Sequence, residues 1–133
     1  MLREIAIGIG CRSGVSAESI ICLTLEVLRD AQPFAQAKIF TLSRKAEEPG
    51  LRAAASSMGF DLVFLDEAEF LIRQSEFASR GATRSAKTQE LTGFSSVAEA
   101  AALMGAGPSA RLIVSRRAAD GVTCAIAAKE DHA

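Results

Sequence analysis

The sequence contains no tryptophan and no tyrosine, and its one histidine, His132, is next to the C-terminal residue. A structural zinc site and a Ser-His or Cys-His catalytic pair are hard to build without histidines, so these classes are disfavoured. The three cysteines, Cys11, Cys22 and Cys124, are odd in number and show no Cys-x-x-Cys or Cys/His ligand spacing. We therefore expect no metal site, and free thiols suit a cytoplasmic protein.

The sequence also has no large excess of charge of either sign and no long apolar run. Lys and Arg number 15 against 16 Asp and Glu, so no overall positive field attracts nucleic acid. No apolar run approaches the roughly 20 residues that cross a bilayer, and the N-terminus does not resemble a signal peptide. We expect neither nucleic acid nor membrane as a partner. A chain of 133 residues with 49% hydrophobic content fits one domain, residues 1–133.

Strands and helices alternate along the chain. Short apolar runs predict strands at residues 5–9, 38–42, 60–65, 112–114 and 122–126. The last two flank the turn residues Asp120-Gly121, which favour a hairpin. The fold class expected from this order is α/β: a three-layer sandwich on a mixed, mainly parallel sheet of about five strands, with a C-terminal antiparallel hairpin.

Helix signals follow the first three strands. Ser16 is a capping residue, Pro49 suits a first helical turn, and Asp66 can cap a short helix. A fourth helix, alanine-rich, is expected at residues 97–104 after Ser96, and residues 79–93 are expected to form a long polar loop. Residues expected to pack in the core include the following: Ile20, Ile21, Leu25 and Leu28 of the first helix, together with Cys22 and Cys124.

The first strand-to-helix connection is rich in glycine. Gly8, Gly10 and Gly14 surround Arg12, so that backbone N–H groups, a helix N-terminus and a guanidinium could together hold a carboxylate or phosphate. The alternative is a tight connection with no ligand. Cys11 could carry a stabilised thiolate here, or it could be a small packing residue.

Two further segments carry candidate binding residues. Lys45 and Glu48 follow the second strand, where ligands collect in open α/β sheets, although the acid could instead complement a helix dipole. Residues 73–87 hold Arg73, Arg80, Arg84 and Lys87 against Glu76. This basic cluster is either a solvated face or a flap over a polyanion, and its lack of aromatic residues argues against single-stranded nucleic acid.

Four blocks of the sequence resemble the CobE/CbiG C-terminal family of cobalamin biosynthesis. They are residues 8–18, residues 41–51, residues 96–103, and residues 112–116 with 122–127. The blocks occur in order and span nearly the whole chain. Ser43 and Arg116 depart from the family pattern, which often has an acid and a lysine at these positions. Members fused to a further N-terminal domain open a lactone and expel a two-carbon fragment, and this chain is too short to hold that domain.

The resemblance implies an anionic precorrin or corrinoid ligand, no cofactor, and other cobalamin-pathway enzymes as possible partners. Candidate ligand-binding residues are Gly8, Gly10, Cys11, Arg12, Ser13, Gly14, Ser16, Thr41, Lys45, Glu48, Arg84, Ser96, Glu99 and Arg116. We expect Arg12 and Lys45 to share one edge of the sheet. Two alternatives stay open: an enzyme that uses Lys45, Glu48 or Cys11, and a nucleotide- or phosphate-binding module that uses the glycine loop.

Overall fold

The structure is a computed structural model that describes residues 4–42, 48–66, 68–69, 97–107 and 110–129. Its elements in chain order are β1 (Glu4–Cys11), α1 (Ala17–Arg29), β2 (Gln36–Leu42), α2 (Pro49–Met58), β3 (Asp61–Leu65), α6 (Val97–Ala106), β4 (Ala110–Ala119) and β5 (Val122–Lys129). The predicted elements that fall in these ranges are all present, and the strands of the C-terminal hairpin are longer than expected.

The five strands form one sheet in the order β3-β2-β1-β5-β4. β1 pairs in parallel with β2, and β2 in parallel with β3, whereas β5 is antiparallel to both of its neighbours, β1 and β4. Four strands therefore run in one direction and β5 runs against them. This arrangement confirms the predicted mixed sheet and its antiparallel hairpin.

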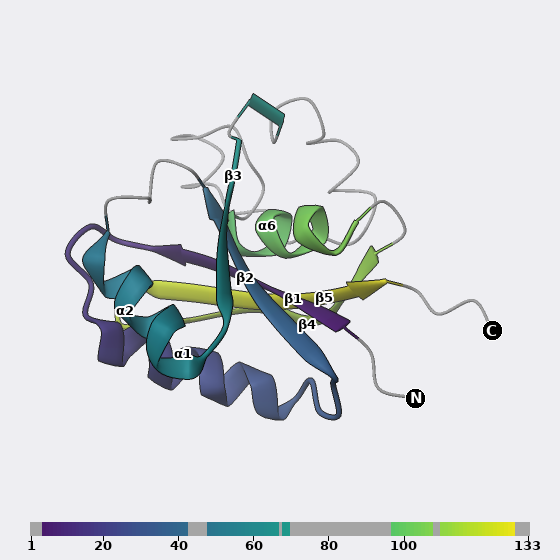
Figure 1. The fold of residues 1–133 in the computed structure, drawn as a ribbon, viewed down its shortest axis with the longest axis horizontal. Helices are drawn as coiled ribbons and strands as arrows, with labels where there is room; N and C mark the ends of the chain where they lie inside the picture. The colour runs from purple at the N-terminus through teal and green to yellow at the C-terminus, as the bar shows by residue number, and fades with distance from the viewer. Residues whose placement is uncertain (1–3, 43–47, 67, 70–96, 108–109, 130–133) are drawn as a thin grey trace.

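Helices cover both faces of the sheet, which gives three layers (Figure 1). α1 and α2 lie on one face and α6 lies on the other. The alternation of side chains along β1 explains the division, because Ile5, Ile7 and Ile9 are buried in the core beneath α1 and α2. The intervening residues include Gly8 and Gly10, which lie against α6.

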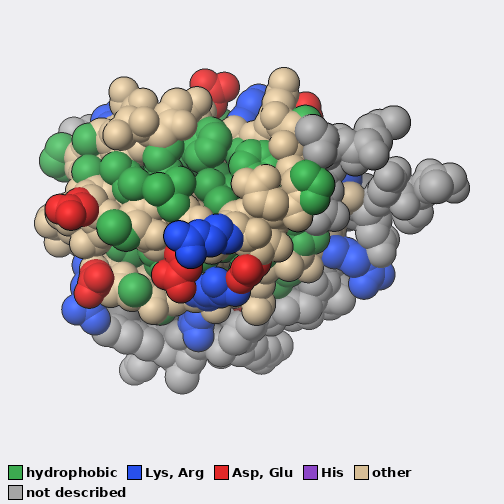
Figure 2. Space-filling view, turned by 90° about the horizontal axis from the view of Figure 1, so that it is seen from below, with side chains coloured by type: hydrophobic (Ala, Val, Ile, Leu, Met, Phe, Trp, Pro, Cys, Tyr) green, Lys and Arg blue, Asp and Glu red, His purple; other side chains and the backbone are tan. Residues whose placement is uncertain are grey.

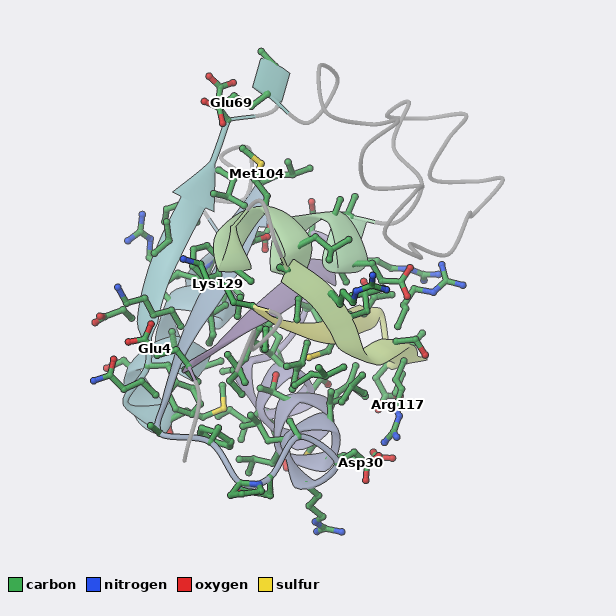
Figure 3. The ribbon with its side chains drawn as sticks, turned by 90° about the vertical axis from the view of Figure 1, so that its right-hand side faces the viewer. Glu4, Asp30, Glu69, Met104, Arg117 and Lys129 are labelled. Carbon is green, nitrogen blue, oxygen red and sulfur yellow. The ribbon has the colours of Figure 1, made fainter. Side chains whose placement is uncertain are left out.

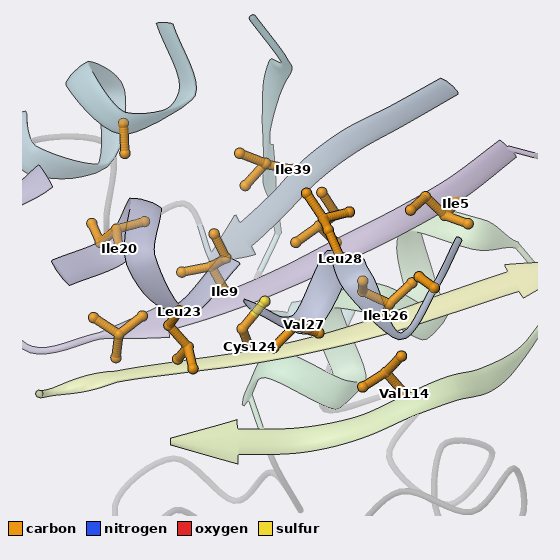
Figure 4. Close-up of a cluster of buried hydrophobic side chains, with 14 of the residues drawn as sticks. Ile5, Ile9, Ile20, Leu23, Val27, Leu28, Ile39, Val114, Cys124 and Ile126 are labelled. Carbon is orange, nitrogen blue, oxygen red and sulfur yellow. The ribbon is translucent and has the colours of Figure 1, made fainter. Parts of the chain in front are cut away.

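The larger core lies between the sheet and α1 with α2. It is built from branched aliphatic side chains of both layers, shown in Figure 4. Full burial of such a side chain contributes roughly 1.5–3 kcal/mol to stability. α1 contributes Ile20, Leu23, Val27 and Leu28, which recur at helical spacing and lie on its inner face.

On the other face of the sheet, the α6 helix packs very close to β1. A Cβ added to Gly8 would lie well inside 3.0 Å of the Ala98 carbonyl oxygen, and one added to Gly105 would meet the Phe40 ring. Real Cβ atoms do not approach other atoms so closely. Glycine at position 8 therefore allows the alanine-rich helix to rest directly on β1.

Turn and cap residues act as their chemistry predicts. The Ser16 side chain accepts a hydrogen bond from the Ser19 N–H at 3.2 Å and begins α1. Gly59 ends α2 in the left-handed region, with φ 76°. Asp120 and Gly121, with φ of 51° and 81°, form the hairpin turn. Positive φ at both central residues is the type I′ signature.

Three expectations about position are wrong. Cys22 is exposed and Leu25 is 49% exposed, because the buried face of α1 takes residues 20, 23, 24, 27 and 28 and leaves both side chains outside. Figure 2 views the molecule from the α1 and α2 side, where hydrophobic side chains gather on the surface. In addition, Gly10 belongs to β1, which runs on to Cys11, so the connecting loop starts later than predicted.

Candidate functional site

The turn between β1 and α1 is short and is held by several hydrogen bonds. The Val15 N–H donates to the Arg12 carbonyl at 3.3 Å, which closes a turn over Ser13 and Gly14. Both are exposed, and Gly14 has φ 80°, as a glycine often does in such turns. The helix that follows is already capped by Ser16, so its N-terminus has one fewer N–H group to offer a ligand.

Glu48 connects this turn to the start of α2. The Gly14 N–H donates to the Glu48 carboxylate at 3.0 Å, although Glu48 makes no cap hydrogen bond in its own helix. Gly50 lies directly against the backbone of Val15. Glu48 of the second candidate segment therefore lies beside the glycine turn. The position where an external anion would meet the Gly14 amide is taken by the protein's own carboxylate.

Arg12 is held by the hairpin turn of β4 and β5. Its N–H donates to the Gly121 carbonyl at 2.9 Å, and the aliphatic part of its side chain packs beside Gly121. The residue is exposed. Its guanidinium makes no hydrogen bond or ion pair within the described ranges. The backbone of Arg12 is thus fixed, and its guanidinium is exposed.

A bulge in β4 places Arg116. Val114 pairs with Ile126 and Arg117 with Cys124. Between these pairs, two residues of β4, Ser115 and Arg116, lie opposite the single residue Ala125 of β5. One residue of the pair Ser115 and Arg116 is therefore extra, which is the definition of a β-bulge. Bulges often lie next to binding sites, where they redirect a side chain.

The bulge turns Arg116 away from the main core. Val114 packs in the α1 core, and Arg117 forms an ion pair with Asp30 at the end of α1, as Figure 3 shows. The bulged residues between them oppose Ala125 and so lie on the α6 face of the sheet. The half-buried Arg116 guanidinium makes no hydrogen bond or ion pair to the part of the chain that the structure describes.

Glu99 contacts the same bulge from α6. It lies in the first turn of the helix, is 0% exposed, and accepts a hydrogen bond from the Arg116 backbone N–H at 2.9 Å. The sequence analysis proposed Glu99 and Arg116 separately, from two different blocks of the family resemblance. The structure brings them into direct contact.

Two polar side chains near the C-terminal end of β1 bond to its backbone. The buried Thr41 hydroxyl donates to the Ile9 carbonyl at 2.8 Å, and the Thr123 hydroxyl donates to the Gly10 carbonyl at 3.3 Å. These bonds join β2 and β5 to β1, which lies between them. Thr41 therefore has a structural partner, and Gly8 and Gly10 lie against α6 and Thr123.

The cysteines differ in environment. Cys11 is half-buried at the end of β1. Cys124 is buried in the core, and desolvation raises the pKa of its thiol to about 12, an effect that the Thr24 hydroxyl and the Arg117 charge only partly oppose. A thiol with such a pKa stays protonated and unreactive at neutral pH. Cys124 is thus a packing residue, as predicted.

Several candidates lie outside the described residues: Lys45, Arg84 and Ser96, with the basic cluster and the loop at residues 79–93. The shared edge predicted for Arg12 and Lys45 stays a prediction, although β1 and β2 end at the same edge. Gly121 and Thr123 were not predicted to belong to the site. The Asp-Gly turn signal located the hairpin, but nothing in it indicated that the turn holds Arg12.

The family model described as cobalamin synthesis G C-terminus matches residues 5–127. The chain belongs to this family. Protein CobE from Sinorhizobium sp is 37% identical over 125 residues, which cover 92% of this chain and 79% of that protein. This family member is thus a cobalamin biosynthesis protein of the CobE/CbiG type.

Two solved structures of cobalamin proteins share the fold. A crystal structure of CobE, described as a protein from the cobalamin (vitamin B12) biosynthetic pathway, has a TM-score of 0.80 and 32% identity, covering 96% of this chain and 91% of that one. Cobalamin biosynthesis protein chiG from Agrobacterium tumefaciens has a TM-score of 0.69 and 30% identity, covering 96% and 99%. Among the described residues of this family member, no helix is long and apolar enough to span a membrane.

Proposed function

We propose that the protein binds an anionic precorrin or corrinoid intermediate of cobalamin biosynthesis, with Arg12 and Arg116 as carboxylate-binding residues. The observation that carries the proposal is that both guanidinium groups lack a partner in the described structure while both backbones are fixed. An arginine held in place loses less entropy when it binds a carboxylate. Precorrins carry several acetate and propionate groups around an apolar ring, so they need separated cations.

The spacing of the two arginines favours a large ligand. Cys11 pairs with Val122 and Val122 with Ala119, so Arg12 lies level with the hairpin turn, about four residues beyond Arg116. One strand, β5, lies between their strands. In a flat sheet these offsets separate the two Cα atoms by about 16 Å. Such a distance suits two carboxylates on different sides of a macrocycle better than a single phosphate.

The alternative of a phosphate site at the glycine loop has less support. The Gly14 N–H already donates to the Glu48 carboxylate, so a bound phosphate would have to displace this carboxylate or lie against its charge. Gly8 and Gly10 are strand residues in contact with α6 and β5. Neither feature resembles a loop of open amides around an anion.

Binding is also better supported than independent catalysis. Among the catalytic candidates, Glu48 already accepts a hydrogen bond from Gly14, and half-buried Cys11 has no histidine close in the sequence to activate it. Lys45 lies outside the described residues. A binding protein of this kind would hold an unstable intermediate and pass it to the next enzyme of the pathway.

A titration followed by absorbance tests the proposal. The purified protein is mixed with a series of precorrin intermediates and with uroporphyrin III, a stable tetrapyrrole with the same acetate and propionate groups. We expect a saturable shift of the chromophore band that weakens as salt is added. No saturable shift with any of these compounds overturns the proposal. A progressive conversion of the chromophore by the protein alone would support the enzyme alternative.

A further inference from the structure

We infer that Glu99 is a positioning residue, which holds the β4 bulge so that the Arg116 guanidinium faces the ligand. The inference rests on the proposed function and adds a residue that would not touch the ligand itself. It assigns a role to a carboxylate that is 0% exposed. A fully buried acid is rare in a soluble protein unless it has hydrogen-bond partners.

The bulge creates a backbone group that needs a partner. Where three steps of β4 face two steps of β5, one residue loses its place in the ladder of hydrogen bonds. The Arg116 N–H finds its acceptor on the Glu99 carboxylate, 2.9 Å away. The carboxylate therefore replaces the ladder bond that the bulge removes. A bond between an N–H and a carboxylate is stronger than an ordinary amide bond and holds the bulged backbone more firmly.

The place of Glu99 in α6 fixes its direction. The helix lies on Gly8 at a distance that only glycine allows, so the α6 backbone packs directly on β1. Glu99 lies one residue after Ala98, which contacts Gly8, and in the first turn, where the helix dipole favours a negative charge. The α6 helix thus acts as a rigid support for the carboxylate and, through it, for the bulge.

The consequence for the ligand is that Arg116 is presented in one backbone conformation. On the other side of the bulge, Arg117 pairs with Cys124 of β5 and forms an ion pair with Asp30 of α1. If the Glu99 contact is lost, the bulge can relax and Arg116 must be ordered again when the ligand binds. That ordering costs affinity without removing any atom that touches the ligand.

A hydrogen-exchange experiment tests the contact directly. Exchange of the Arg116 amide is followed by NMR in the wild type, Glu99→Ala, Glu99→Gln and Ile20→Val. Ile20→Val weakens the core on the opposite face of the sheet and serves as the control for lower overall stability. We expect at least tenfold faster exchange at Arg116 in Glu99→Ala alone, because glutamine keeps an acceptor oxygen. Equal protection of this amide in Glu99→Ala overturns the inference.

A double-mutant cycle tests the effect on binding. Affinity for uroporphyrin III is measured for the wild type, Glu99→Ala, Arg116→Ala and the double variant, and also for Glu99→Gln. We expect Glu99→Ala to weaken binding three- to tenfold when Arg116 is present and to change nothing in the Arg116→Ala background. Equal weakening in both backgrounds means that Glu99 does not act through Arg116 and overturns the inference.

The two hypotheses fail in different ways. If neither the precorrins nor uroporphyrin III bind to the wild type, the proposed function fails and the ligand role of Glu99 fails with it. If the wild type binds and the cycle shows no coupling, the proposed function stands and only the positioning role is lost. Recovery of wild-type affinity in Glu99→Gln supports the hydrogen bond, and not the charge, as the means of positioning.

Discussion

Replacing Arg12 or Arg116 by alanine should weaken ligand binding and leave the fold almost unchanged. A charge-assisted hydrogen bond contributes about 1.5–3 kcal/mol, so each change should reduce affinity roughly ten- to a hundredfold. Arg116 is half-buried and Arg12 is exposed, so water screens the Arg116 contact less. We therefore expect the larger loss for Arg116→Ala and the smaller for Arg12→Ala.

The assay is an absorbance titration with uroporphyrin III at two salt concentrations, paired with thermal unfolding. Arg29→Ala is the matched control, because Arg29 is an exposed arginine in the last turn of α1, on the opposite face of the sheet. The control should bind like the wild type, and all three variants should melt close to it. Affinities of Arg12→Ala and Arg116→Ala equal to that of Arg29→Ala would refute the proposed site. A large fall in melting temperature for both would indicate structural roles instead.

Three further predictions concern the fold. Gly8→Ala should destabilise the protein by about 3 kcal/mol or more, since its Cβ would overlap the Ala98 backbone. A variant that unfolds at the same urea concentration as the wild type would contradict the close packing of α6. An alkylating reagent at neutral pH should modify exposed Cys22 and spare Cys124 until the protein unfolds; labelling of Cys124 in the folded protein would show that the core is open. Because the pKa of Cys124 is raised from 9.0 to about 12, its contribution to stability is fully present below pH 9 and is lost as pH rises toward 12. The free energy of unfolding should therefore fall more steeply in this range, by up to about 1.4 kcal/mol per pH unit, than in Cys124→Ala; parallel curves would contradict the raised pKa.

Sequence patterns predicted the strands and turns well because these depend on local chemistry. The alternation around Ile7 and the Asp120-Gly121 turn each specify one backbone conformation. The outer face of α1 was predicted less well. Leu25 fits a helical stripe with Leu28 as well as Val27 does, and only the tertiary packing decides which stripe faces the sheet.

The sequence indicated which residues belong to the candidate site better than it indicated how they contact one another. Arg12, Glu48 and Glu99 were all selected, but each has a contact from a distant part of the chain that local spacing does not encode. The Glu99 contact depends on the bulge near Arg116, and a bulge has no reliable sequence signal when no glycine marks it. Gly8 was proposed as a ligand-binding residue because its true neighbour, Ala98, is far away in sequence.

The central claim is that an anionic tetrapyrrole binds on the hairpin side of β1, between Arg12 and the bulge at Arg116. NMR mapping of backbone amides during a titration with uroporphyrin III, repeated with a precorrin, tests this most directly. We predict that the largest shifts occur at Arg12, Gly121 and Arg116, and that Gly14 and Ser16 change little. Shifts concentrated at Gly14 and Ser16, with none at Arg116, would place the ligand at the glycine turn and contradict the account.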